Sequence, residues 1–430
     1  MSKTALVLGG GGSRGSFQIG VWQALNELDI NIDIVTGTSV GALNAALIAM
    51  NDYDNAFNLW KQIKTSMVLA VDIDESLSTQ KQTKAMIRQF ISDYAKQGGT
   101  DAYPLKELLN QYVNEEIIRN SPIECGFIMV DKKSLKPKQL YKEDIKEGQM
   151  ADYLLASSSL FPAIKSCNIE GIEYIDGGYY DNLPVELALN KGAEHVIAVD
   201  LEAIGMVRKQ AIAKAENLTM IRSYWNLGPI LVFDNKTNVR NIRLGYLDTM
   251  KAFHVFDGVA YTFIKNQIPA MTKKRKELIH QLNDILQLTF TNNNHTGKEE
   301  LFHLKIQTHL TNKYGKEMNG RHTTFIRACM EEAAELFELD YLKIYSVDIF
   351  EQKLNEMINK VEVPYYNEQD MKKPRKYNAA LALLDKKART VYLAIMMKKA
   401  MYEHKKLDAL ALAFFVTDEF LAAYYIALMD

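Results

Sequence analysis

The chain has 430 residues, of which 47% are hydrophobic and 24% are charged, a composition that excludes disordered and collagen-like chains. Its 51 Lys and Arg residues and 53 Asp and Glu residues give a net charge of −2, which argues against nucleic acid as the partner. Glycine is unevenly distributed, because 20 of the 23 glycines lie at or before residue 258. Glycine favours turns and weakens helix interiors, so the sequence predicts a turn-rich front part and a helix-rich back part.

The N-terminus and the cysteines indicate the cellular compartment in which the protein is expected. The chain enters an apolar run at residue 4, without the basic segment and longer apolar stretch of a secretory signal. Cys125, Cys167 and Cys329 are an odd number and have no metal-ligand spacing, which is typical of reduced thiols. We therefore expect a cytoplasmic protein, with peripheral attachment to a membrane as the further option.

Two strand–loop–helix units open the chain. Apolar runs at residues 4–8 and 32–36 predict buried strands, and each is followed by a glycine-containing turn and a helical pattern. Two such units in succession predict a parallel sheet with helices on its faces.

The middle of the chain continues this pattern. Residues 53–120 are predicted to be mainly helical, and 125–130 form another buried strand. The Lys-rich segment 131–148 is interpreted as a surface excursion, and 195–201 as the last parallel strand.

Beyond residue 260 the periodicity is helical throughout. We therefore predict two domains, an α/β domain over residues 1–260 and an α-helical region of unknown role over residues 261–430. The helices of the second region are expected near residues 278–286, 325–337, 350–361, 378–404 and 407–429.

The pentapeptide Gly37-Thr38-Ser39-Val40-Gly41 has the pattern G-x-S-x-G between a predicted strand and a predicted helix. A nucleophilic serine needs a tight turn that exposes its hydroxyl oxygen, and small flanking residues let strand and helix approach closely. A simple strand-to-helix turn is the alternative for this segment.

The segment 10–15, Gly-Gly-Gly-Ser-Arg-Gly, lies at the preceding strand-to-helix junction. Its amides could cradle a cofactor phosphate, form an oxyanion hole, or only pack a turn. The dinucleotide pattern G-x-G-x-x-G is met, and Asp33 lies near the distance of a ribose-binding acid. No Lys-Ser/Thr pair follows the glycines, so a Walker A loop is excluded.

The third segment, Asp176-Gly177-Gly178, is by itself a common turn. A serine needs a base to accept its proton, and histidine is the usual one. None of the eight histidines has a catalytic context in the sequence, so a Ser–His–Asp triad cannot be assembled.

These three motifs, in this order, resemble the patatin-like phospholipase family, bacterial type. The segments 156–162, Ala-Ser-Ser-Ser-Leu-Phe-Pro, and 182–184, Asn-Leu-Pro, extend the resemblance, which covers about residues 4–205. The resemblance implies a three-layer α/β core with a mainly parallel central sheet. It also implies an acyl hydrolase with a Ser–Asp dyad instead of a triad.

The resemblance assigns roles to individual residues. It implies that Ser39 is the nucleophile, that Asp176 is the general base, and that no metal or cofactor takes part. Three sets of neighbours follow: an oxyanion loop of Gly10, Gly11, Gly12, Arg14 and Gly15, a nucleophile turn of Gly37, Thr38, Val40 and Gly41, and a base loop of Gly177 and Gly178. Asp181 lies outside the Asp-Gly-Gly position and is given no role.

The implied substrate is a phospholipid or another acyl-ester lipid, cleaved through an acyl-enzyme intermediate. The basic cluster at residues 273–276, Lys-Lys-Arg-Lys, is a candidate contact with anionic headgroups. Two alternatives remain open: a lipase effector gated through its helical region by a partner or signal, and a nucleotide-binding module that uses the glycine loop.

Overall fold

The computed structural model describes residues 2–286, 288, 298–314, 322–363, 384–407 and 417–429. The chain divides into two units, Met1–Phe253 and His254–Asp430, and each is described by itself. The sequence predicts the boundary after residue 260. The division lies earlier because residues 256–257 already pair with residues 263–264 inside the second unit.

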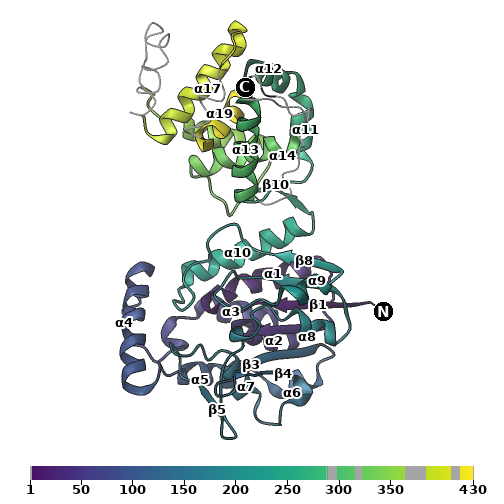
Figure 1. Ribbon diagram of the computed structural model, residues 1–430, viewed down its shortest axis with the longest axis vertical. Coiled ribbons are helices and arrows are strands. Elements are labelled where there is room, and N and C mark those ends of the chain that lie inside the picture. Colours follow the sequence, from purple (N-terminus) through teal and green to yellow (C-terminus); the bar gives the residue numbers. More distant parts are fainter. Residues whose placement is uncertain are drawn as a thin grey trace. The chain divides into compact units, whose positions relative to one another are not determined.

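The first unit is built on an eight-stranded sheet with the order β5-β6-β3-β2-β1-β7-β8, and β4 pairs with β3 outside this order (Figure 1). Strands β1, β2, β3, β7 and β8 are parallel, whereas β4 and β6 are antiparallel to β3, and β5 is antiparallel to β6. The strands are β1 (Lys3–Leu8), β2 (Ile34–Thr38), β3 (Glu124–Asp131), β4 (Pro137–Tyr141), β5 (Cys167–Ile169), β6 (Ile172–Asp176), β7 (Ala193–Val199) and β8 (Asn217–Ile221).

Helices cover both faces of this sheet. Successive strand side chains point to opposite faces, so Ala5 and Val7 of β1 face one side and Leu6 and Leu8 face the other. Ala5 and Val7 pack with residues of α8 (Val185–Asn190) and α9 (Lys209–Lys214). On the face of Leu8, helix α2 (Val40–Ala49) contacts β1, β2 and β3. The unit is therefore a three-layer α/β/α fold with a mostly parallel sheet, as the sequence predicts.

The remaining helices of this unit lie around the α2 layer or at the sheet edge. Helix α1 packs along α10 and also contacts α2 and α3, and α7 contacts β3, β5 and β6. Local signals set several ends: the Asp52 and Asp234 carboxylates accept the N–H groups of Asn55 and Thr237, which begin α3 and α10. The bounds are α1 (Ser16–Glu27), α3 (Tyr53–Gln62), α4 (Thr79–Gln97), α5 (Tyr103–Tyr112), α6 (Glu115–Asn120), α7 (Met150–Ser157) and α10 (Asn235–Ala252).

Two predictions about this unit are wrong. The segment 131–148 contains the strand β4, which pairs antiparallel with β3. The lysines of β4 interrupt the apolar pattern by which a strand is recognised in the sequence. Lysine is nevertheless common on edge strands. The Lys138 ammonium of β4 lies 5.3 Å from the ring centre of Tyr174. The parallel sheet also continues past residue 201, because β8 adds to β7. This edge strand is only partly buried, so it lacks a continuous apolar run.

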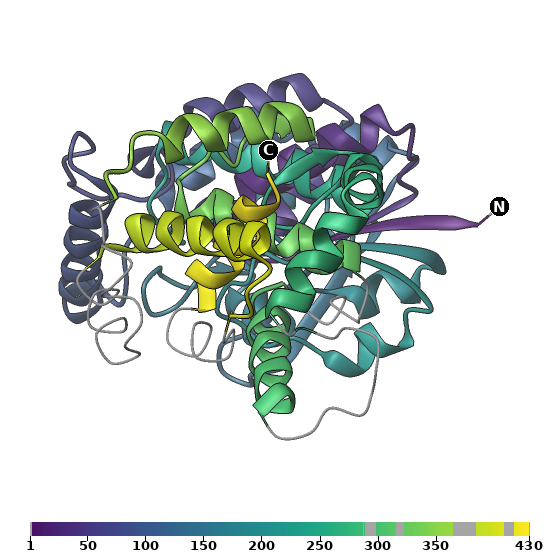
Figure 2. The ribbon, with the colours of Figure 1, turned by 90° about the horizontal axis from the view of Figure 1, so that it is seen from above.

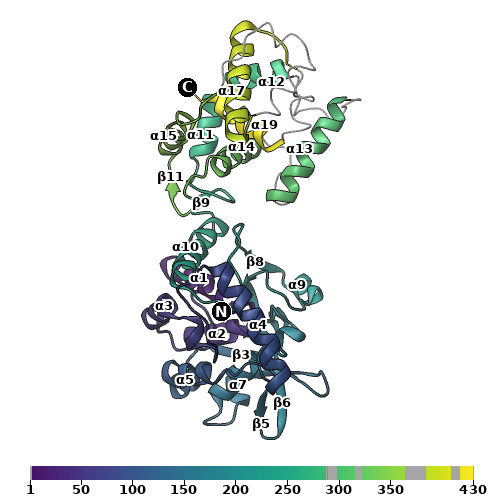
Figure 3. The same ribbon diagram turned by 90° about the vertical axis from the view of Figure 1, so that its left-hand side faces the viewer.

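The second unit is mainly helical. A small sheet of β9 (Phe256–Asp257), β10 (Thr262–Ile264) and β11 (Ile344–Tyr345) adjoins the helices. Helix α19 packs against α14 and α17 (Figures 2 and 3). The helices are α11 (Gln267–Lys274), α12 (Lys276–Leu286), α13 (Lys298–Tyr314), α14 (His322–Leu336), α15 (Val347–Ile358), α17 (Lys386–Glu403) and α19 (Thr417–Leu428). Residues 378–383 and 408–416 of the predicted helices lie outside the described residues.

The predicted basic cluster at residues 273–276 lies at the junction of α11 and α12. Its arginine is not available to a membrane, because the Arg275 guanidinium pairs with the Glu351 carboxylate, Nη2 to Oε2 at 3.0 Å. Among the described residues, no helix combines the length and the hydropathy needed to cross a bilayer.

Candidate active site

Ser39 lies in the sharp turn between β2 and α2. Its backbone has φ 56° and ψ −128°, a strained conformation for a residue other than glycine. The turn is held by polar contacts, because the Ser39 N–H donates to Ser157 Oγ at 3.1 Å and that hydroxyl donates to the Ile128 carbonyl at 2.7 Å. Gly41 is required for this approach, since a Cβ there would lie 2.1 Å from the carbonyl oxygen of Leu8. The sequence folds this way because only glycine leaves room for α2 to start directly on β1.

Asp176 ends β6 and faces the serine turn across β3. The residue is 3% exposed, and its carboxylate accepts a hydrogen bond from the Gly178 N–H at 2.7 Å. The Ser39 hydroxyl lies close enough to the carboxyl to lower its pKa. Burial raises the pKa of the Asp176 carboxyl to about 6, although the Gly178 N–H and the Ser39 hydroxyl act in the opposite direction. A carboxylate of this pKa is ionised at neutral pH and is more basic than an ordinary aspartate.

The glycine loop connects β1 to α1 beside Ser39. The N–H groups of Gly9 and Gly10 donate to Val199 and Asn182 carbonyls at 2.9 and 3.0 Å, and the Ser13 N–H donates to the Ile230 carbonyl at 2.7 Å. The N–H groups between them, on residues 11 and 12, have no hydrogen-bond partner among the residues that the structure describes. Both residues line the same cavity as Ser39.

The other predicted members of the oxyanion loop are engaged elsewhere. The Gly10 N–H donates to the Asn182 carbonyl, as described above, and the Gly15 carbonyl accepts a hydrogen bond from the Asn44 side-chain amide at 3.0 Å. The Arg14 guanidinium donates to the carbonyls of Leu201, Glu202 and Gly228 at 2.8 to 3.0 Å. Arg14 therefore ties two distant loops to the glycine loop and does not line the cavity.

The two residues that flank Ser39 also differ in position. Val40 lines the cavity, whereas the Thr38 hydroxyl points away from it and donates to the Asp181 carbonyl at 2.8 Å. Gly37 is paired within the sheet, opposite Leu8 of β1.

A cavity of about 650 Å³ joins these groups. Ser39, Asp176, Gly11 and Gly12 lie on its wall. The rest of the lining is mostly apolar, including Leu43, Leu47, Leu59, Trp60, Leu105, Leu108, Leu109, Val113, Leu160, Phe161, Ile204, Met206, Leu231 and Phe233. Of the described side chains that line it, none is a Lys, Arg or His. The arrangement offers an apolar chain a binding site that ends at Ser39 and Asp176.

A buried polar network beneath the loop was not predicted from the sequence. Trp60 Nε1–H donates to Asn44 Oδ1 at 2.9 Å, Asn44 Nδ2 to Gln18 Oε1 at 2.8 Å, and Gln18 Nε2 to the Gly9 carbonyl at 2.7 Å. The signal available in the sequence is a polar residue at a buried helical position, as at Gln18 and Asn44, both 0% exposed.

A second buried carboxylate, Asp181, lies near the site without lining the cavity. Burial raises its pKa to about 6, and its Oδ1 accepts the N–H groups of Leu183 and Arg208 at 3.3 and 3.4 Å. Because it has no contact with Ser39, it is a natural comparison for Asp176.

One group of side chains in the second unit has the spacing of metal ligands: His309, Glu332 and Asp418. The Lys313 ammonium lies 2.6 Å from Glu332 Oε2 and already supplies a cation there. We therefore interpret this group as an ion-pair network.

Residues 6–189 match the family model described as Patatin-like phospholipase. Over these residues the first unit is similar to the patatin-like phospholipase family. Curated relatives align with between about half and three quarters of this chain. Lysophospholipase NTE1 of Meyerozyma guilliermondii is 26% identical over 343 residues, 75% of this chain and 21% of the relative. Lysophospholipase nte1 of Aspergillus terreus is 31% identical over 204 residues, 46% of this chain and 12% of the relative.

The alignment therefore spans about a fifth or less of the length of these relatives. Among solved structures, VipD from Legionella pneumophila aligns over 100% of this chain and 92% of its own, with 13% identity and a TM-score of 0.36. An alignment at this score carries no argument about function.

Proposed function

We propose that the chain is a lipid acyl hydrolase in which Ser39 is the nucleophile and Asp176 the general base. The observation that carries the proposal is that the Ser39 hydroxyl and the buried Asp176 carboxyl lie together at the wall of an apolar cavity, where the hydroxyl acts to lower the pKa of the carboxyl. A hydroxyl held against a carboxylate of raised pKa is poised to lose its proton as it attacks a carbonyl.

The reaction follows from these positions. Ser39 Oγ attacks the ester carbonyl carbon while Asp176 accepts the hydroxyl proton. The carbonyl oxygen becomes an oxyanion, and the uncommitted N–H groups of Gly11 and Gly12 are the donors we assign to it, each worth about 3 kcal/mol of barrier in comparable sites. Asp176 then returns the proton to the leaving alcohol, and an acyl-serine forms. Water, deprotonated by Asp176, hydrolyses this ester and releases the fatty acid.

The substrate class is proposed from the cavity and from the relatives. An apolar lining suits an acyl chain, and the curated relatives are named lysophospholipases. We propose a lysophospholipid or a similar single-chain acyl ester. The nucleotide-binding alternative has less support, because the described lining lacks a cationic side chain to face a phosphate.

The test of the nucleophile compares two serines of the same cavity. Ser39→Ala in the full chain should reduce fatty-acid release from lysophosphatidylcholine by at least about a thousandfold. Ser158→Ala is the matched control, because Ser158 also lines the cavity but donates to the Leu154 carbonyl at 3.1 Å. Wild-type activity in the first variant contradicts the proposal.

The test of the base compares the two buried carboxylates. Asp176→Asn should lose most of the activity and most of the labelling of Ser39 by a fluorophosphonate, because the base is gone. Asp181→Asn should keep both, since Asp181 does not line the cavity. Equal losses in both variants, with both folded by circular dichroism, would remove Asp176 from the mechanism.

A further inference from the structure

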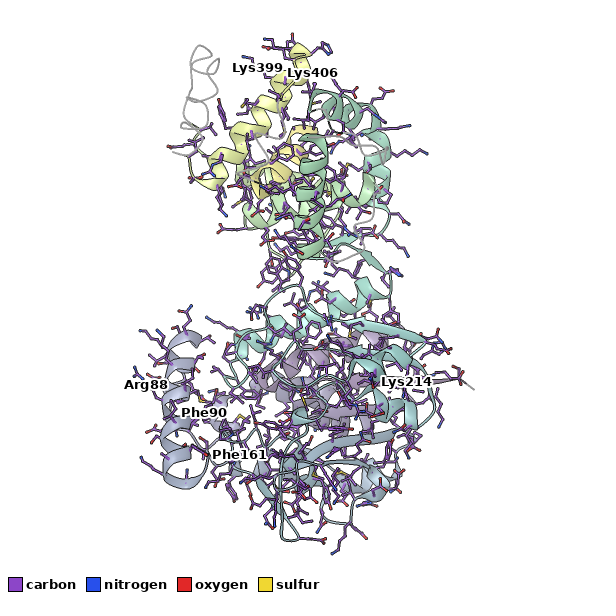
Figure 4. The ribbon with its side chains drawn as sticks, viewed as in Figure 1. Arg88, Phe90, Phe161, Lys214, Lys399 and Lys406 are labelled. Atoms are coloured by element: carbon purple, nitrogen blue, oxygen red, sulfur yellow. The ribbon has the colours of Figure 1, made fainter. Side chains whose placement is uncertain are left out.

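Helix α4 presents a row of apolar side chains to solvent. Its inner side holds Gln82 and Met86, which are 3% and 2% exposed. Ile87, Ile91 and Tyr94 follow at intervals of four and three residues, on one helical stripe, and are 53%, 68% and 51% exposed. Figure 4 shows Phe90 on the side of α4 that faces the rest of the first unit and Arg88 on the side that faces away. Single exposed apolar residues are ordinary, but a contiguous row on one helix indicates an interaction surface.

Basic residues accompany this row. Helix α4 carries Lys81, Lys84, Arg88 and Lys96 and one acidic residue, Asp93, so four minus one gives it a net charge of +3. Asp93 is turned inward, where its carboxylate accepts the Thr100 hydroxyl at 2.7 Å. Lys84 and Arg88 lie one turn apart beside the two isoleucines and are exposed.

The acidic loop before α4 contains Asp72, Asp74 and Glu75, and it lies against the other side of the helix. The Asp72 N–H donates to Gln89 Oε1 at 3.2 Å, and Gln89 is on the helix face opposite to Ile87. The carboxylates of Asp74 and Glu75 accept the N–H groups of Ser76 and Ser66 at 2.9 Å. The exposed stripe is therefore apolar and basic.

The stripe is continuous with the cavity of the proposed active site. The ring of Tyr94 meets the ring of Phe161 edge to face at 6.0 Å, and Phe161 lines the cavity. The chain after α4 is fixed to the same wall, because Thr100 exchanges backbone hydrogen bonds of 3.0 Å with Ala163 and Lys165. Ile204 and Met206 also line the cavity, yet they are 91% and 56% exposed.

We propose that the exposed stripe of α4, formed by Lys84, Ile87, Arg88, Ile91 and Tyr94, docks on the surface of a lipid bilayer that contains anionic lipids. A helix with an apolar row bordered by basic side chains lies in the headgroup region, with its apolar side chains in the acyl boundary. Each basic residue near an anionic surface adds about 1 kcal/mol. Docking on this side brings the cavity against the bilayer, so that an acyl chain passes between them with little contact with water. The passage of an acyl chain from the bilayer into the cavity rests on the proposed function, whereas the docking itself does not.

The binding test uses the full chain with Ser39→Ala, so that no lipid is consumed. Sedimentation is measured with vesicles of phosphatidylcholine alone and with vesicles that also contain phosphatidylglycerol. Ile87→Gln with Ile91→Gln should weaken binding to the anionic vesicles by about tenfold at low and at high salt. Lys84→Gln with Arg88→Gln should weaken it by about tenfold at low salt only, because salt screens the charge term.

Matched variants control for surface apolarity and charge in general. Ile117 of α6 and Ile172 of β6 are 47% and 44% exposed, and α6 lies far from α4 (Figure 1). Ile117→Gln with Ile172→Gln should bind within twofold of the parent, as should Lys209→Gln with Lys214→Gln on α9. Figure 4 shows Lys214 on the opposite side of the first unit from Arg88. Binding by the isoleucine variant of α4 equal to that of its control overturns the proposal.

Activity and self-association separate the remaining outcomes. With Ser39 present, the α4 variants should hydrolyse a water-soluble short-chain ester at the parental rate and lysophosphatidylcholine presented in anionic vesicles about tenfold more slowly. If no chain hydrolyses either substrate, the parent included, the proposed function is contradicted. The docking result still stands in that case. If the isoleucine variant abolishes self-association in sedimentation velocity and leaves vesicle binding unchanged, the stripe is a contact between copies and the proposal is wrong.

Discussion

The two units treat a buried carboxylate in opposite ways. Asp176 of the first unit and Glu332 of the second are 3% and 2% exposed. The donors that act on Asp176, the Gly178 N–H and the Ser39 hydroxyl, are neutral, and burial raises its pKa to about 6. Burial also acts to raise the pKa of Glu332, but hydrogen bonding by His309 and the ion pair with Lys313 hold it below its ordinary value.

The difference separates a reactive group from a structural one. A paired carboxylate is a poor base because its charge is already stabilised, whereas an unpaired buried carboxylate gains by accepting a proton. At the first of these carboxylates the backbone is also strained, since Ser39 is held in its turn with φ 56° and ψ −128° beside Asp176. Strain and uncompensated burial are found together where we propose the chemistry, whereas the ion pair with Lys313 compensates the buried Glu332.

The largest effect is expected where the strained turn has no room for another atom. Gly41→Ala would place a Cβ 2.1 Å from the Leu8 carbonyl oxygen. We expect a loss of more than about 4 kcal/mol of folding free energy, and at least a hundredfold loss of activity in any folded fraction. Urea denaturation and ester hydrolysis measure the two quantities. Gly98→Ala is the control, because nothing lies within 4 Å of its added Cβ, and its φ of +80° costs only about 1 kcal/mol. Equal losses in the Gly41→Ala and Gly98→Ala variants would show that the lack of room at Gly41 is not the cause of the loss.

Removing the cation from the second carboxylate should be nearly as costly. Lys313→Met leaves Glu332 buried without its ammonium partner and should destabilise the second unit by about 3 to 4 kcal/mol. Scanning calorimetry of the full chain measures this as a lowered transition temperature. Lys313→Met with Glu332→Gln should recover part of the loss, because no uncompensated charge remains. A single variant as stable as the parent would show that Glu332 does not depend on this pair.

Removing the charge from the first carboxylate should stabilise the fold. Between pH 4 and 6 the native Asp176 keeps a proton that the unfolded chain has lost, so its contribution to stability falls as pH rises through this window. Asp176→Asn does not ionise, and its advantage should grow from near zero at pH 4 to about 3 kcal/mol above pH 6. Denaturation at several pH values tests this. A variant less stable than the parent at pH 8 would mean that Asp176 has a compensating partner.

The smallest effect is the titration of the base itself. If Asp176 accepts the serine proton, kcat/KM for a water-soluble ester should rise about tenfold per pH unit below pH 6 and level off above it. Asp181→Asn should leave this profile in place, although the Asp181 pKa is also raised to about 6. If the midpoint of the profile moves in the Asp181→Asn variant, the titrating group is Asp181 and the assignment to Asp176 is wrong.

Much of the fold is predictable from local pattern. Apolar runs at residues 4–8 and 125–130 lie within β1 and β3, because strands buried on both faces need continuous apolar residues. The edge strands β4 and β8 are not predictable in this way. One face of an edge strand is partly exposed, so lysines and asparagines interrupt the apolar pattern.

The candidate site, like the fold, is predictable from local sequence only in part. By itself the sequence determined the turn around Ser39, because glycines on both sides of a serine between strand and helix specify a local geometry. It also supplied Asp176, through an ordered set of motifs. Only the tertiary structure decided that these two side chains meet at one cavity wall, since β3 has to lie between β2 and β6 to align their ends.

The same holds for the glycine loop and for α4. Five residues of the loop were candidates, but the carbonyls of Asn182 and Ile230, distant in the chain, accept the N–H groups on either side of Gly11 and Gly12 and leave those two uncommitted. The periodicity of α4 predicts a helix, and only packing decides that its inner side takes Met86 and leaves Ile87 and Ile91 in solvent. Local sequence sets which conformations a segment can adopt. Which polar groups and apolar side chains stay free is set by neighbours that only the folded chain brings together.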